Sequence, residues 1–227
     1  MQQYPKIDSL IQKGKVSKSP QDSEQWFKQA KRKIEQKECD SFYGEFTTAE
    51  INYLQGNSEE ALNSLTEQLD AFDKQLPSIE IDGEHEMFTE GIYQKYVKFW
   101  SRGFISEECL QGALSTCNET LIILDNRWSD PLKTDIRKIL NLIGKALCYQ
   151  KSSDPHTNGC KGLNYQLTSF FLDPTHASDI HQISHTLTRL DRHFDAIILL
   201  QYGIQSKISN QTTTTMLENL YKIKKMI

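Results

Sequence analysis

The chain has little of what interrupts a helix or builds a sheet. Its 227 residues include only six prolines and eleven glycines, and no convincing run alternates apolar and polar residues as a β-strand does. No apolar stretch is long enough to cross a bilayer; the longest are 121–124 and 196–200. The first residues lack the apolar region of a secretory signal. These absences predict a cytoplasmic, all-α protein without a membrane-spanning segment.

The sequence also lacks the common signatures of catalysis. It contains no glycine-rich phosphate loop, no dinucleotide-binding fingerprint and no nucleophile elbow. Its five cysteines are widely spaced and form no Cys-x-x-Cys pair, which favours reduced thiols packed as small apolar residues. We therefore expect a protein that is not an enzyme and that binds no cofactor.

Apolar residues recur at steps of three and four along most of the chain, which is the pattern of amphipathic helices. They predict about ten antiparallel helices in a bundle or a short superhelix. The predicted helices cover 3–13, 19–39, two helices within 42–76, and then 87–101, 106–124, 130–147, 163–172, 180–190, 194–204 and 216–223. Ser19 and Pro20 should begin the second of these as cap and first helical residue. A turn is expected at 125–129 and a polar loop at 151–161.

The acidic connector 77–86, the longest of its kind in the sequence, is a plausible boundary between domains. It follows the helix that Pro77 stops, and it contains Asp82 and Gly83, a pair typical of turns. The sequence thus predicts N-terminal helices over 1–76 and a C-terminal helical bundle over 87–227, or else one continuous domain.

The central hairpin, 42–76, carries a resemblance to a known family. Its tight turn is Gln55-Gly56-Asn57, and Ser58 followed by two glutamates should cap the second helix. Together with Ala49 and Tyr53, the run Gly56–Leu62 resembles the turn and second helix of a tetratricopeptide repeat. The resemblance covers about one repeat, with a weaker echo at 195–200.

This resemblance implies two antiparallel helices whose small residues pack together, and a groove that receives a peptide or helix. The residues with which some members of that family bind a carboxylate have no counterpart in this sequence. The resemblance therefore predicts no carboxylate-binding residues here.

Charge is distributed unevenly along the chain. The net charge is −4, but residues 38–90 hold one lysine and fourteen acidic residues, a balance of −13, whereas residues 1–37 balance to +5. Such asymmetry bears on partner choice and association rate. It predicts an acidic surface that binds a protein partner with a basic surface. The residues expected to carry it are Glu45, Glu59, Glu60, Glu67, Asp70 and Asp73.

Two alternatives remain open at this stage. The helix 20–38 is basic on one side and carries Trp26 and Phe27, so it could track nucleic-acid phosphates through Lys28, Lys31, Arg32 and Lys33. His181 and His185 lie four residues apart on a predicted helix, the spacing of two metal ligands, so a helical metalloenzyme is the second alternative.

The main hypothesis is a non-enzymatic protein–protein interaction module (an adaptor, regulator or inhibitor) that binds through a helical groove and an acidic surface. A homo-oligomer is compatible with it. We expect no metal at the histidines and no membrane partner.

Overall fold

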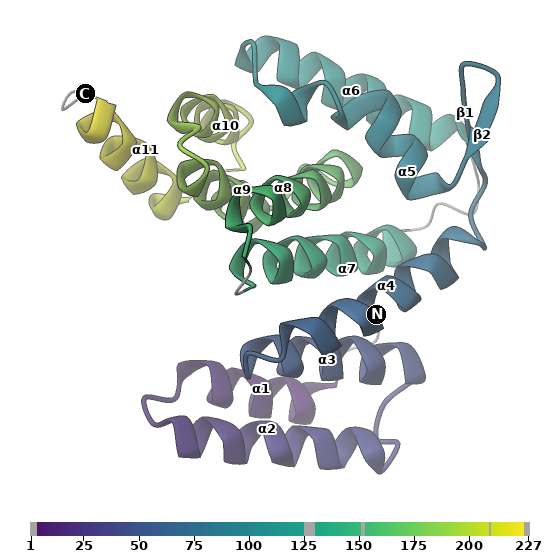
Figure 1. Ribbon diagram of the computed structural model, residues 1–227, viewed down its shortest axis with the longest axis vertical. Coiled ribbons are helices and arrows are strands. Elements are labelled where there is room, and N and C mark those ends of the chain that lie inside the picture. Colours follow the sequence, from purple (N-terminus) through teal and green to yellow (C-terminus); the bar gives the residue numbers. More distant parts are fainter. Residues whose placement is uncertain (1–3, 125–129, 151–152, 209, 225–227) are drawn as a thin grey trace. The chain divides into compact units, whose positions relative to one another are not determined.

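The computed structural model describes residues 4–124, 130–150, 153–208 and 210–224. Within these ranges the chain forms eleven α-helices and one two-stranded hairpin (Figure 1). The predicted all-α fold is confirmed. The expected turn at 125–129 and the first two residues of the expected 151–161 loop lie outside the described residues.

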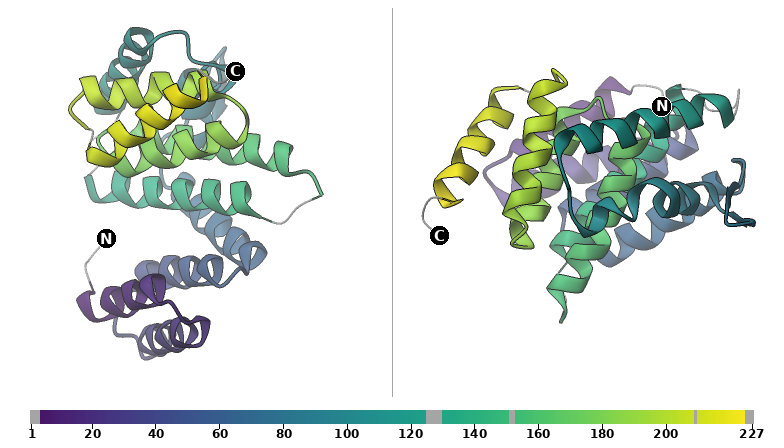
Figure 2. Two further views of the ribbon diagram at one scale, coloured as in Figure 1. Left: turned by 90° about the vertical axis from the view of Figure 1, so that its left-hand side faces the viewer. Right: turned by 90° about the horizontal axis from the view of Figure 1, so that it is seen from above.

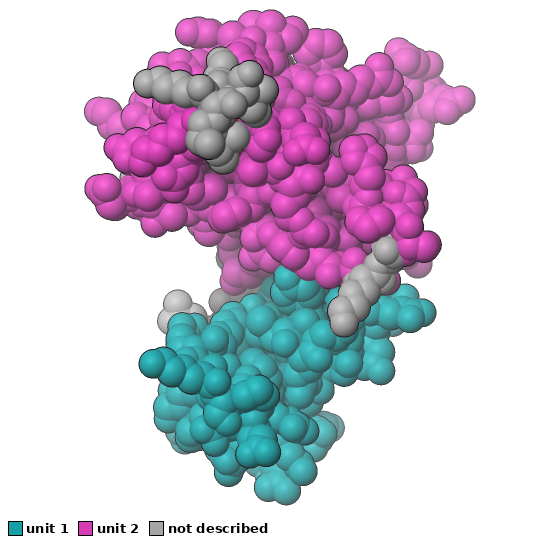
Figure 3. All heavy atoms as spheres, turned by 60° about the vertical axis from the view of Figure 1, so that its left-hand side comes forward, with its two compact units in different colours: residues 1–68 teal, residues 69–227 magenta. Residues whose placement is uncertain are grey.

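The chain divides into two compact units, residues 1–68 and 69–227, which Figure 3 colours separately. The division falls within helix α4, upstream of the connector at which the sequence places it. Each unit is described by itself below.

Unit 1 contains α1 (Pro5–Val16), α2 (Pro20–Glu35), α3 (Ser41–Leu54) and most of α4 (Ser58–Asp73). Ser19 accepts a hydrogen bond from the backbone N–H of Asp22, 3.3 Å away, which confirms the predicted cap of α2. The helices bury one apolar core, made of Ile7, Ile11, Phe27, Ala30, Tyr43 and Ile51.

The turn between α3 and α4 forms where the sequence places it. Gly56 has a φ of +87°, a conformation that favours glycine. Ala49, Ala61 and Leu65 are completely buried. The backbones of α3 and α4 nevertheless approach each other closely at few places, in contrast to the tightly paired α1 and α2. The relationship to tetratricopeptide repeats stays a prediction.

Unit 2 begins with the end of α4 and a short hairpin that the sequence analysis missed. Strand β1 (Ile79–Ile81) pairs antiparallel with β2 (Glu84–Glu86) around the turn at Asp82 and Gly83, both of which have positive φ. The turn expected at Asp82 and Gly83 forms, but the connector 77–86 is not without strands, because Ile79 is buried and packs against Gly91. Asp-Gly with positive φ at both residues is a turn that two-residue hairpins favour.

Helices make up most of the described remainder of unit 2 (Figures 1 and 2). A single helical run comprises α5 (Phe88–Ile92), the π-helix η1 (Tyr93–Val97) and the 3₁₀ turn η2 (Trp100–Arg102). The others are α6 (Glu107–Leu124), α7 (Asp130–Tyr149), α8 (Pro155–Leu172), α9 (Ala177–Arg189), α10 (His193–Gln205) and α11 (Gln211–Lys224).

Helices α7 and α8 form the tightest pair of unit 2. At their crossing, a Cβ built on Gly144 would lie 2.7 Å from the carbonyl oxygen of Gly162, and a Cβ on Gly162 would lie 2.6 Å from that of Gly144. The absence of two side chains therefore brings the backbones together. Helix α8 begins at Pro155 with Asp154 as its cap, so the prediction of a loop through residue 161 was wrong.

A buried polar cluster ties α7 to α9. The guanidinium of Arg137 donates to the carboxylate of Asp179 over 2.6 Å, and the side-chain amide of Asn141 donates to the same carboxylate over 3.0 Å. All three residues are buried. A buried carboxylate with both oxygens paired avoids most of the cost of its desolvation.

Candidate partner-binding surface

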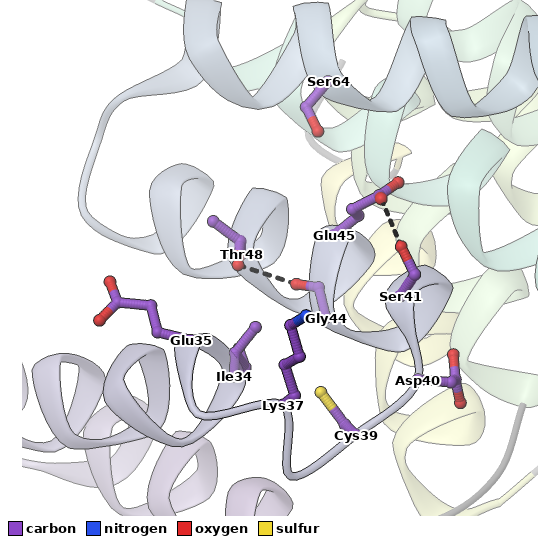
Figure 4. A pocket seen from close by; sticks show the side chains of 10 residues that line it. All are labelled: Ile34, Glu35, Lys37, Cys39, Asp40, Ser41, Gly44, Glu45, Thr48 and Ser64. Atoms are coloured by element: carbon purple, nitrogen blue, oxygen red, sulfur yellow. Dashed lines mark hydrogen bonds between the residues drawn. The ribbon is translucent and has the colours of Figure 1, made fainter.

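Unit 1 has a hollow of about 580 Å³ where α2 ends and α3 begins (Figure 4). This volume lies in the range of sites that take a small ligand or a group of side chains. The hollow is lined mainly by α2, α3 and the segment between them, with one residue from α4; the lining residues are Ile34, Glu35, Lys37, Cys39, Asp40, Ser41, Gly44, Glu45, Thr48 and Ser64.

Backbone geometry shapes the hollow. Two residues after the end of α2, Lys37 adopts the left-handed conformation with a φ of 57°, and the N–H of Glu38 donates to the carbonyl of Lys33 over 3.1 Å. This is the closing pattern of a helix that turns sharply away. A Cβ on Gly44 would lie 2.9 Å from a methyl of Ile34, so glycine lets the end of α2 lie close against α3.

Three carboxylates surround the hollow. Asp40 accepts the backbone N–H of Tyr43 over 2.8 Å and thereby caps α3. Glu45 accepts the hydroxyl of Ser41 over 2.7 Å, as Figure 4 shows. With Glu35 and a single lysine, Lys37, the lining carries three negative charges and one positive.

The only sulfur in this lining is not arranged as a nucleophile. Burial raises the pKa of the Cys39 thiol, and the neighbouring carboxylates of Asp40 and Glu38 raise it further. A thiol that stays protonated is a poor nucleophile, and no histidine lines the hollow to take its proton. The arrangement suits recognition of a cationic or amphipathic group.

The structure sorts the predicted acidic residues into two groups. Glu45, Glu59, Glu60, Glu67 and Asp70 are exposed, as a partner-binding role requires.

The prediction that Asp73 belongs to the acidic surface was wrong. It is buried, and its carboxylate accepts both the backbone N–H of Thr89, 3.0 Å away, and the Thr89 hydroxyl. Asp73 therefore accepts a backbone N–H that would lack a partner at the beginning of α5, and its carboxylate is not available to a partner protein. Burial raises its pKa, while the bonds from Thr89 act in the opposite direction.

The predicted basic face of α2 is partly occupied by its own chain. The ammonium of Lys31 donates to the side chains of Asn52 and Gln55, and that of Lys33 pairs with Glu38 at 3.0 Å. Lys28 and Arg32 are exposed. Phe27 is buried in the core, so it does not offer a ring for stacking on bases.

The two histidines considered as metal ligands have different surroundings. Nε2 of His181 lies 2.7 Å from the hydroxyl of Thr213, whereas His185 is exposed. Burial lowers the pKa of His181, as does the nearby His185. Among the residues that the structure describes, no three His, Cys, Asp or Glu side chains are grouped so that they could hold a metal ion.

Sequence reasoning missed Glu35 and Asp40 as parts of the same site as Glu45. The predicted helix runs from 19 to 39, so the sharp turn between α2 and α3, which brings Glu35 toward Glu45, was not predicted. The signal for Asp40 was present, because Asp followed by Ser begins the helix α3 as a capping residue does.

Comparisons of this chain with protein-family models, with curated proteins and with solved structures found no match. Within the described ranges, no helix is long and apolar enough to span a membrane.

Proposed function

We propose that this protein is a non-enzymatic interaction module that binds a protein partner bearing a basic, amphipathic segment. The observation that carries the proposal is the hollow at the α2–α3 corner, where Glu35, Asp40 and Glu45 surround a lining that includes Ile34. An apolar side chain of the partner would enter the hollow, and its lysines or arginines would face the three carboxylates.

Two further observations support this proposal. Most of the residues that line the hollow belong to the segment 38–90, which has a net charge of −13. This negative charge attracts a basic partner before contact, and dissolved salt shortens the distance over which it acts. The exposed Glu59, Glu60 and Glu67 on α4 continue this acidic character. Rim charges of this kind govern association rate and partner choice more than they govern final affinity.

A charge-reversal experiment tests the proposal. The probe is a fluorescein-labelled 18-residue helical peptide with leucine on one face and lysine on the other, titrated with the full chain by fluorescence anisotropy at low and high salt. The double variant Glu35→Lys/Glu45→Lys should weaken binding about tenfold at low salt, since two attractive contacts become repulsive.

The matched control is Glu24→Lys/Glu84→Lys, which changes the net charge equally at exposed positions outside the hollow. It should retain most of the binding. Equal loss in both double variants would show that only the overall charge matters, and would refute a site at the α2–α3 corner. Capture from a lysate with the wild type and both variants then names the partner as the protein that the first variant alone loses.

A further inference from the structure

The helical run from Phe88 to Arg102 in unit 2 has an unusual geometry. It passes from α5 into five residues of π-helix and then, after Val97, into a 3₁₀ turn. π-helical segments are rare and occur frequently at functional sites. Four residues in the second half of this run are exposed: Lys95, Lys98, Phe99 and Arg102.

The end of this run is held firmly against the beginning of α10. The guanidinium of Arg192 donates to the carbonyl of Ser101 over 2.6 Å, and Asp195 accepts the backbone N–H of Phe104 over 2.9 Å. Arg192 and Asp195 also pair with each other at 2.6 Å. Figures 1 and 2 show this part of the chain beside α10. The surface it presents is therefore preorganised, which lowers the cost of binding.

Large apolar side chains are exposed around this anchor. Phe99 is 56% exposed, Ile105 is 63% exposed and Phe194 is 58% exposed. Ile105 follows Phe104, and Phe194 precedes Asp195, so the hydrogen bond between Phe104 and Asp195 holds the backbone positions of the two exposed residues near each other. Apolar residues gathered in this way mark interaction sites more often than isolated ones do. We call Phe99, Ile105 and Phe194, with Lys98 and Arg102, the aromatic-basic patch.

Charge indicates what this patch binds. Residues 91–106 contain three basic residues and no acidic residue. Two exposed acidic residues lie close to this basic segment in the fold or the sequence: Glu108 at the start of α6 and Asp191 before α10. A nucleic-acid backbone or an anionic bilayer carries negative charge throughout and would meet these carboxylates as well. A protein segment can instead place its acidic residues at Lys98 and Arg102 alone.

We infer that the aromatic-basic patch is a second interface, which takes an acidic amphipathic helix of a partner protein. The apolar face of that helix contacts Phe99, Ile105 and Phe194, and its carboxylates pair with Lys98 and Arg102. Exposed aromatic residues on a rigid support are the usual anchors of such interfaces. The inference does not rest on the proposed function, since it concerns other residues and a partner of opposite charge.

The test uses the full chain and a labelled 18-residue helical peptide with leucine on one face and glutamate on the other. A peptide of the same composition in scrambled order serves as the reference. Phe99→Ser should weaken binding at least tenfold, because it removes the exposed aromatic ring that lies between Lys98 and Arg102 in the sequence. Val16→Ser, at a similarly exposed apolar position in unit 1, should leave it unchanged.

Charge exchange makes the test specific. Lys98→Glu/Arg102→Glu should abolish binding of the leucine–glutamate peptide. In the Glu35→Lys/Glu45→Lys background, where binding at the hollow is weakened, it should also add binding of the matching leucine–lysine peptide, and Phe99→Ser should weaken that added binding. The inference is overturned if the leucine–glutamate peptide binds no better than its scrambled form, or if Phe99→Ser binds as the wild type does. Preferential binding of a 20-nucleotide single strand or of phosphatidylserine vesicles, lost in the same variants, would also overturn it.

Discussion

Replacing Gly144 by alanine should destabilise unit 2 because of what the new methyl group would meet. A Cβ at this position lies 2.5 Å from Cγ of Gln166 and 2.7 Å from the carbonyl oxygen of Gly162. Real Cβ atoms do not come so close to a backbone oxygen, so α8 would have to move away from α7 by several tenths of an ångström. Gln166 is itself completely buried, which leaves its side chain little room to yield.

The magnitude follows from two opposing contributions. Alanine stabilises a helix interior by about 1 kcal/mol relative to glycine. Overpacking a close helix crossing costs about 3 kcal/mol when backbone atoms must separate. The free energy of unfolding of unit 2 should therefore fall by about 2 kcal/mol.

Gly112 provides the matched control. It also lies within a helix, α6, but a Cβ there would meet no atom within 4 Å, so Gly112→Ala should stabilise unit 2 by up to about 1 kcal/mol. Urea unfolding followed by tryptophan fluorescence measures both variants. A Trp26→Phe background removes the only tryptophan of unit 1. Equal stability of the two alanine variants would refute the close approach of α7 and α8.

Three further predictions concern polar contacts within unit 2. Asp179→Ala should lower the free energy of unfolding by about 3 kcal/mol, since the buried Arg137 guanidinium then keeps only the Asp173 carboxylate, whose Oδ2 lies 4.0 Å from Nε. Arg137→Met/Asp179→Leu should cost less, and urea unfolding compares the two variants. Asp73→Ala should cost about 1–2 kcal/mol through loss of both bonds from Thr89, with faster hydrogen exchange at the start of α5. Because the pKa of His181 is lowered, its neutral form is favoured in the folded state. The contribution of His181 to the free energy of unfolding should therefore be fully present above pH about 6.5 and should decline as the pH falls below that value. In thermal unfolding, the midpoint of the His181→Gln variant should change less with pH than that of the wild type.

Helix positions were predictable because they depend on local patterns. The cap at Ser19 and the turn at Gly56 form as the sequence indicates. Both features are set by residues within a few positions of each other. The same holds for the apolar stripes, whose spacing alone determines which side of a helix is buried.

Glycines misled the sequence analysis where their role is long-range. Gly159 falls in the polar loop predicted at 151–161, yet it lies inside α8, where a Cβ would come within 2.9 Å of the Leu190 side chain. A glycine that permits close packing cannot be told from a glycine that permits a turn without knowing its spatial neighbours. The end of α2 was missed for a related reason, since Lys37 adopts the left-handed conformation without being glycine.

The acidic composition predicted the sign of a surface but not which carboxylates form it. Asp73 and Asp70 lie on the same helix three residues apart, yet one is buried against Thr89 and the other is exposed. Glu35 joins Glu45 only because the chain turns sharply between α2 and α3. Membership of a site depends on these tertiary details, which composition cannot contain.

The two proposed interfaces also constrain each other through their charge. A basic segment that binds the hollow beside Glu45 would be repelled by Lys98 and Arg102. An acidic segment that binds Lys98 and Arg102 would be repelled by residues 38–90, whose net charge is −13. Such mutual rejection is a physical basis for specificity. The two proposed surfaces would therefore select different partners, one basic and one acidic, as the two binding sites of an adaptor do.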